Sequence, residues 1–213
     1  MKKNIAMRVA AFLFILTMIS TCAFATTFAK YTTAESKTET ARVAKWGVEV
    51  KLTTEDLFKK GYAADNTLAE DDSSVVLSST TDKVVAPGTG GNITLSIKGT
   101  PEVDASVVYN ANLTLSGWDV NGAYCPLVIK VNGAEFKIGA SYSDTDAIEE
   151  AVVAAILALN TTVDANESVD NSITVTWEWA FDGDDDNDTI LGDAAAAPTI
   201  TFTIGCTVTQ LEN

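Results

Sequence analysis

The densest group of potential metal ligands in the sequence is an acidic run between residues 182 and 193. Carboxylates alternate along it, and Ca²⁺ takes six to eight oxygen ligands of this kind. The candidate calcium ligands are Asp182, Asp184, Asp186, Asp188 and Asp193. The run departs from the helix–loop–helix calcium motif because Asn187 stands where that motif needs glycine, and because the flanking segments are typical of strands. Two interpretations stay open: a calcium-binding loop, or a solvated hairpin loop whose charges discourage pairing at a sheet edge.

Composition argues against two other classes of function. The chain has no histidine, which rules out Ser-His-Asp and Cys-His nucleophiles and histidine-bearing zinc motifs. Paired carboxylates can hydrolyse glycosides, but no pair stands out here. The 29 acidic residues against 14 basic ones give a net charge of −15, which repels nucleic acid. We therefore predict a protein that is not an enzyme, has calcium as its one candidate cofactor and does not bind nucleic acid.

Residues 1–29 have the features of an export signal. A cationic start precedes an apolar run from Val9 to Ile19, broken only by Thr17. This run is shorter than the ~20 residues that a membrane-spanning helix needs. Small residues then offer cleavage after Ala25 or after Ala29. We expect a signal peptidase to remove this segment, so that the membrane is a partner only before cleavage and the mature protein is secreted.

Two cysteines, Cys125 and Cys206, lie beyond the predicted signal. An even number of cysteines in an exported chain permits a disulfide. The alternative is a pair of reduced thiols that pack as small apolar groups. The sequence leaves both interpretations open.

Tryptophans are the residues best suited to stack on a sugar ring. Trp46, Trp177 and Trp179 share the parity of apolar neighbours along predicted strands, which favours core positions. Trp118 instead lies in a Gly-Trp-Asp turn. We therefore predict Trp118 as the one exposed ligand platform.

The elements that would position these groups are mostly strands. Apolar and polar residues alternate over residues 44–52, 93–97, 103–115, 127–131, 173–181 and 200–208. Asn132-Gly133 is the favoured pair for a type I′ hairpin turn. One helical stripe, from Ile148 to Leu159, predicts a single amphipathic helix at about 144–159. The pattern predicts a mainly β chain: one antiparallel β-sandwich domain over residues 30–213, with a polar, mobile N-terminal arm to about residue 40.

Several segments, taken in order, carry a resemblance to a known family. They are the signal end Thr27–Tyr31, the strand Ala41–Val48, the Ala86-Pro87-Gly88 turn, the strand Ile93–Ile97 and the threonine-rich closing strand Thr199–Gln210. In this order they resemble the TasA/camelysin-like (CalY-like) secreted proteins of Gram-positive bacteria. The likeness spans most of the mature chain.

The resemblance implies a jelly-roll-like sandwich and a structural, non-enzymatic role in extracellular biofilm-matrix fibres or at the cell surface. It also implies a homopolymer, in which the N-terminal arm of one copy adds as a strand to the next copy. The metallopeptidase activity described for camelysin-like members is not carried over, because the chain has no histidine-bearing zinc motif. The alternative function is a secreted module that binds a glycan or a host protein, with Trp118 as platform and calcium shaping the acidic loop.

Overall fold

The computed structural model describes residues 3–26, 40–53, 56–66, 74–118, 124–139 and 141–212. The chain divides into two compact units, Met1–Arg42 and Val43–Asn213. In the first unit, the helix α1 (Lys3–Thr26) covers most of the predicted signal. The predicted cleavage site after Ala29 and most of the predicted arm lie outside the described residues.

The second unit contains ten strands and two helices among its described residues. In chain order they are β1 (Val48–Leu52), β2 (Gly61–Tyr62), β3 (Val76–Leu77), β4 (Gly90–Gly99), β5 (Ala105–Ser116), β6 (Leu127–Val131), β7 (Ala134–Phe136), α2 (Thr145–Leu157), β8 (Thr161–Val163), β9 (Val169–Trp179), α3 (Asp185–Gly192) and β10 (Thr199–Gln210). The expectation of a mainly β chain with a helix near 144–159 is confirmed.

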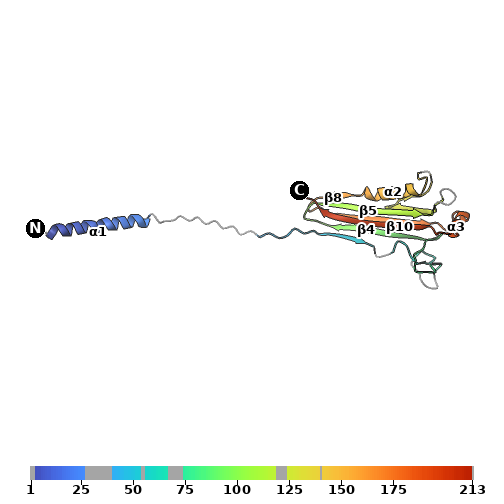
Figure 1. The fold of residues 1–213 in the computed structure, drawn as a ribbon, viewed down its shortest axis with the longest axis horizontal. Coiled ribbons are helices and arrows are strands. Elements are labelled where there is room, and N and C mark those ends of the chain that lie inside the picture. The colour runs from blue at the N-terminus through green and yellow to red at the C-terminus, as the bar shows by residue number, and fades with distance from the viewer. Residues whose placement is uncertain are drawn as a thin grey trace. The chain divides into compact units, whose positions relative to one another are not determined.

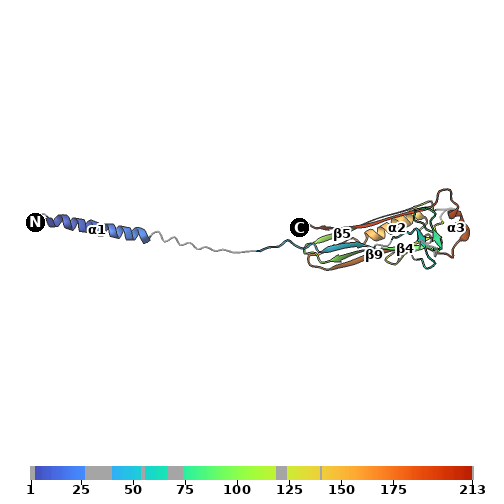
Figure 2. The same ribbon diagram turned by 90° about the horizontal axis from the view of Figure 1, so that it is seen from below.

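Two antiparallel sheets form the body of this unit. One has five strands in the order β1-β4-β9-β6-β7, and the other has three in the order β10-β5-β8. Figure 1 shows β8, β5 and β10 side by side, and Figure 2 shows β5 and β9 in separate layers. The inward side chains of both sheets belong to one buried core, which includes Ile97 and Trp177 from the first sheet and Val107 and Leu113 from the second. The unit is therefore an antiparallel β-sandwich.

The helix α2 closes one side of this sandwich. It packs on β5, β6 and β7, with Ile148, Val152 and Ile156 buried against the core. Asp144 caps its start by accepting a hydrogen bond of 2.8 Å from the backbone N–H of Ala147. The capping residue is thus Asp144, which receives a further bond from the hydroxyl of Ser143.

Local turn chemistry fixes the β6–β7 hairpin. Asn132 and Gly133 have φ of 48° and 85°, the left-handed values that a type I′ turn needs at both central residues. Val131 and Ala134 pair directly across the turn. The predicted hairpin is therefore confirmed.

The acidic run differs from the expected loop because it folds into α3. Asp184 occupies the N-cap position and accepts a hydrogen bond of 3.2 Å from the backbone N–H of Asn187. Three aspartates stand in the first turn, where the positive end of the helix dipole favours them, and Leu191 is buried. The acidic run thus adds a second, short helix to the predicted one, because capping and one buried leucine suffice to form it.

Candidate functional site

The five predicted calcium ligands do not converge on one point. Asp182 precedes the helix, Asp184 caps it, Asp186 and Asp188 lie within it, and Asp193 is its C-terminal cap. Among the described residues, no group of three or more acidic, cysteine or histidine side chains lies close enough to hold a metal ion. The helix spreads these carboxylates, so the geometry that the calcium interpretation required is not formed here.

One of these aspartates instead ties α3 to the core. Asp188 accepts a hydrogen bond of 2.5 Å from the hydroxyl of Tyr124 and one of 3.3 Å from the indole N–H of Trp179. Burial, together with the hydrogen bond and the charge of Asp188, raises the pKa of Tyr124 well above its ordinary value. The cluster is a structural anchor: a neutral phenol and an indole hold one carboxylate.

The structure corrects the placement of two tryptophans. Trp118 is only 1% exposed, and its indole N–H donates a 2.9 Å hydrogen bond to the carbonyl of Thr199 while its ring lies edge-on to Trp179. It is therefore a core residue and not a ligand platform. Trp46, expected in the core, is 39% exposed because the strand begins only at Val48. Trp177 and Trp179 are buried as predicted.

The two cysteines are free thiols. Cys125 is buried just before β6, and Cys206 is half-buried in β10, in the other sheet. Burial raises the pKa of the Cys125 thiol to about 11, which keeps it protonated and unreactive at neutral pH. The sequence left open either a disulfide or two reduced thiols, and in the structure both thiols are reduced.

In the described part of the chain, no helix covers the opposite side of the sandwich, where Leu57, Phe58 and Lys83 line only part of the gap between the sheets. Here the edge strand β10 of one sheet faces β1 and β4 of the other across a hollow of about 290 Å³. Its walls include Leu52 from β1, Ile93 from β4, and Phe202 and Ile204 from β10. We call this side, with the strands β1 and β10 that border it, the open seam. It is the principal candidate for a functional site.

Side chains along the open seam are incompletely buried. In β5, the central strand, Val107, Tyr109 and Leu113 are buried almost completely. The residues of β10 that face the same core, from Ile200 to Val208, are only half-buried. Across the seam, Leu52 of β1 is 48% exposed. The seam therefore offers apolar surface next to a free strand edge, which is what an added strand would cover.

The segment that leads from the predicted arm into β1 is fixed to the body of the sandwich. The N–H of Lys45 donates to the carboxylate of Glu102 at 2.8 Å, and the N–H of Glu102 donates to the carbonyl of Lys45 at 3.0 Å. Gly47 has φ of 61°, and a Cβ there would lie 2.8 Å from the carbonyl oxygen of Thr100. The residues 45–47 are therefore held against the body of the sandwich.

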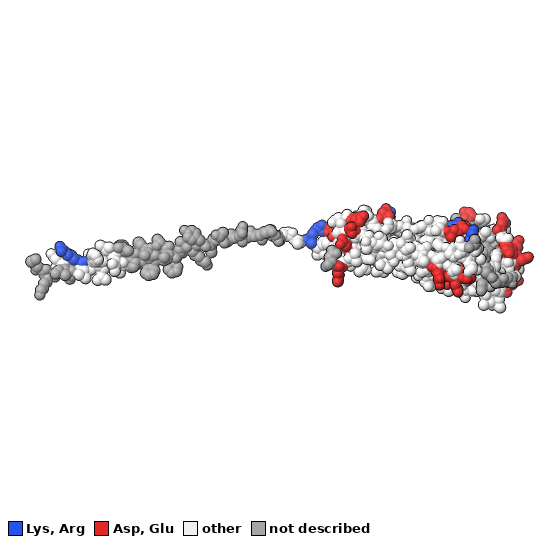
Figure 3. All heavy atoms as spheres, turned by 90° about the horizontal axis from the view of Figure 1, so that it is seen from above, with Lys and Arg blue, Asp and Glu red and all other residues white. Residues whose placement is uncertain are grey.

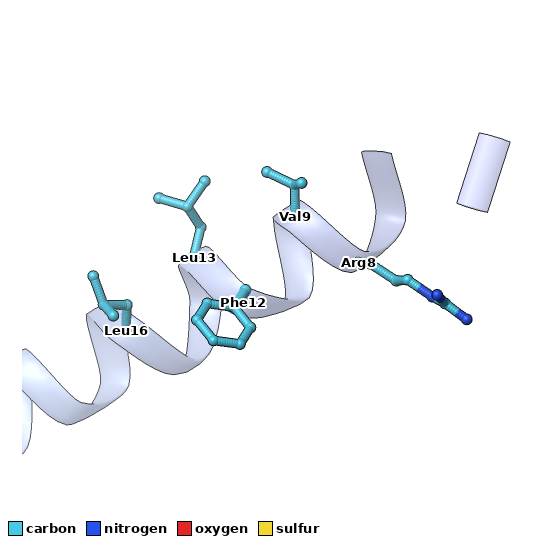
Figure 4. Close-up of a pocket in the computed structure, with 5 residues that line it drawn as sticks. All are labelled: Arg8, Val9, Phe12, Leu13 and Leu16. Atoms are coloured by element: carbon cyan, nitrogen blue, oxygen red, sulfur yellow. The ribbon is translucent and has the colours of Figure 1, made fainter. Parts of the chain in front are cut away.

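A further apolar surface lies on α1 alone. Figure 4 shows the residues that form it and flank it: Arg8, Val9, Phe12, Leu13 and Leu16, all from successive turns of one helix. Four of these residues belong to the apolar run of the predicted export signal, and Arg8 belongs to its cationic start. Within the described residues, no helix combines the length and hydropathy that a membrane crossing requires.

Comparison with known proteins adds no relative from which a site could be transferred. No protein-family model matches the sequence, and no curated protein matches it. The assignment of the open seam as the candidate site therefore rests on the geometry of this chain.

Proposed function

We propose that this chain is a secreted structural subunit that assembles with copies of itself. The N-terminal arm of one copy adds as a strand at the open seam of the next, and the product is a fibre of an extracellular biofilm matrix or the cell surface. Support comes from the export signal, from the resemblance to TasA/camelysin-like proteins, and from the architecture of the sandwich. The role is passive, in keeping with a sequence that has no histidine for general base chemistry.

The single observation that carries the proposal is the contrast between the two sides of the sandwich. α2 covers one side with three buried apolar residues, whereas the other has a hollow and two strands whose outer edges pair with no further strand among the described residues. A natural sheet protein usually protects its edges, because an unpaired edge is a template for another strand. A seam left open along β10 is thus suited to assembly.

The contacts of Lys45, where the predicted arm joins the domain, support the same proposal. Hydrogen bonds between Lys45 and Glu102 hold the chain where it enters the domain. A strand donated to a neighbour would then be tied firmly to its own subunit. An extended arm of about 15 residues reaches roughly 50 Å, which is enough to follow a seam bordered by β10.

The alternative of a glycan- or protein-binding module loses the two features on which it rested. Trp118 is buried, and the acidic residues around α3 do not form a ligand cage. We therefore do not propose it.

Electron microscopy of the purified mature protein tests the proposal. We expect fibres from the intact protein and none after deletion of residues 26–40. Tyr31→Ser keeps the arm length and removes a large apolar group, so it should reduce fibre formation, whereas Thr33→Ser serves as the matched control and should leave it unchanged. Intact protein that stays unassembled, or fibres that survive deletion of the arm, would refute the proposal.

A further inference from the structure

The four outer edges of the two main sheets are protected to very different degrees. β1 carries Glu49 and Lys51, which form a 2.9 Å ion pair, and β8 has only three residues. β7 is equally short and carries Glu135. Charge and shortness are the usual ways to prevent strand addition. β10 has neither: its twelve residues, TITFTIGCTVTQ, include no charged residue and no proline.

The hydrogen bonds around β5 show which backbone groups of β10 are free to pair. The N–H of Tyr109 donates to Asn160 and the N–H of Leu115 donates to Glu149, so both point away from β10. Directly opposed residues in an antiparallel pair either both bond across it or both face away. The partners of these two residues, Cys206 and Ile200, therefore direct their N–H and C=O groups to the free edge.

The register continues without interruption, so every even-numbered residue of this part of β10 is oriented in the same way. The set that presents its backbone to the free edge is Ile200, Phe202, Ile204, Cys206 and Val208. The same residues carry the half-buried side chains of the open seam. A strand paired here would both bond this edge and cover apolar surface.

The sequence of β10 is complementary to itself when reversed about Ile204. We infer that two copies of this chain pair through β10, antiparallel and across a two-fold axis at Ile204, to give one continuous six-stranded sheet. The opposed residues on the inner face are Ile200 with Val208, Phe202 with Cys206, and Ile204 with its own copy. Those on the outer face are Thr199 with Thr209, Thr201 with Thr207, and Thr203 with Gly205.

Most opposed pairs in this register match in chemistry. Apolar side chains meet on the inner face, and on the outer face two kinds of pair join threonines, which stabilise a sheet across strands, while Thr203 opposes Gly205. The five inner pairs would exchange about ten backbone hydrogen bonds. A shift of the register by one residue would place apolar side chains opposite threonines, so only registers that keep the two faces matched are favoured.

Charge also favours this strand as the contact between copies. The chain has a net charge of −15, so two copies repel each other over most of their surface. In the face shown in Figure 3, acidic side chains gather towards the two ends of the second unit. An uncharged twelve-residue strand is a place where two such molecules can approach closely. Because salt screens the repulsion that remains, pairing should tighten as ionic strength rises.

This pairing goes beyond the proposed function, because it places a second β10, and not an arm, along the free edge of β10. A second copy and an arm would compete for that edge. Arm-driven fibres and β10-driven pairs are therefore separate products that respond to different variants.

A cross-linking experiment on the full mature chain tests the register. Ile204→Cys, in a Cys206→Ser background, places two thiols opposite each other at a Cα separation of about 5.5 Å, within the range that a disulfide allows. Thr203→Cys in the same background is the matched control, because its copy lies about 8 Å away, beyond that range. Under mild oxidation, we expect a linked dimer from Ile204→Cys and little from Thr203→Cys.

Light scattering provides a measurement without a new thiol. The parent protein should have twice the monomer mass, and Ile204→Pro should raise the dimer Kd about 30-fold, because it removes two of the shared hydrogen bonds. Ile204 does not bond to β5, so this proline spares the existing sheet. A parent that stays monomeric at high concentration and salt would overturn the inference, as would equal cross-linking of both cysteine variants.

The arm is the competing occupant of this edge. Association that disappears with residues 26–40, without any Ile204→Cys cross-link, would overturn the β10 pairing and assign the edge to the arm. Dimers that persist without the arm, in a protein that forms no fibres, would support the pairing while refuting the proposed function.

Discussion

Loss of the two side chains that accept backbone N–H groups on the outer edge of β5 should destabilise the sandwich in a measurable and additive way. The carboxylate of Glu149 accepts the N–H of Leu115 at 2.5 Å, and the amide oxygen of Asn160 accepts the N–H of Tyr109 at 2.7 Å. Both donors belong to buried residues. Replacing either acceptor with alanine leaves a backbone N–H without its partner, at a cost of about 1–3 kcal/mol.

The two sites lie roughly 20 Å apart along the strand, so their effects should add to about 2–6 kcal/mol in the double variant Glu149→Ala with Asn160→Ala. For a domain of this size, each single variant should lower Tm by roughly 2–12 °C. Urea unfolding followed by the fluorescence of the buried tryptophans measures these free energies.

Two further variants isolate the cause. Glu149→Gln keeps an oxygen acceptor and should recover most of the lost stability. Glu150→Ala, on the exposed side of the same helix, should be close to neutral. If Glu149→Ala unfolds at the same urea concentration as Glu150→Ala, then α2 does not stabilise β5 through its edge, and the reasoning fails.

Three further predictions concern individual contacts. Tyr124→Phe should cost about 1 kcal/mol through its lost bond to Asp188. Burial of Tyr124 and its bond to Asp188 raise its pKa, so the stability it provides is complete below about pH 10 and declines above that. The free energy of unfolding should therefore fall less steeply with alkaline pH in the variant than in the parent. Equal slopes for the two proteins would contradict this. At Asp144, bonds from the N–H of Ala147 and from a serine hydroxyl lower the pKa, so its contribution is complete above about pH 4 and is lost in stronger acid. Asp144→Ala should reduce the helical circular dichroism of the protein at pH 7 and make no difference at pH 2. Trp118→Phe should destabilise the protein by about 2 kcal/mol, because the smaller ring leaves a gap in the core and the carbonyl of Thr199 loses its indole donor. Tighter sugar binding by the parent than by this variant, with equal stability of the two, would restore the platform interpretation.

Local patterns in the sequence were enough to predict most of the sandwich. The alternation over residues 103–115 predicts β5, and the Asn132-Gly133 pair predicts the turn, because side-chain parity and left-handed backbone values are properties of neighbouring residues. The helix near 144–159 follows from its apolar stripe in the same way. These features depend little on distant contacts.

Long-range contacts explain the predictions that were wrong. The Gly-Trp-Asp turn suggests an exposed Trp118, but its partners, Thr199 and Trp179, are more than 60 residues away. The sequence does contain a signal for α3, since an N-cap aspartate, Asp184, stands before a short run that ends in an apolar residue, Leu191. The alternating carboxylates of the same run also fit a calcium-binding loop, and this was one of the two interpretations that the sequence left open.

The sequence does not predict the open seam, for a related reason. Parity predicts which side chains of β10 face the core, but it does not distinguish an edge strand from a central one, because that depends on strand order. A usable signal was present nonetheless. β10 combines a length of twelve residues with no charge, whereas β1 and β7 each carry charged residues.

The position of α2 limits how many molecules one sheet can join. Because the helix occupies most of the flank of β5 and the remaining strand there, β8, has three residues, this sheet can recruit a neighbour only along β10. Each molecule thus has a valency of one through this surface, and once two copies have met there the growth of the sheet stops. Any polymer longer than a pair needs a second kind of joint, so its length and its branching would be controlled separately.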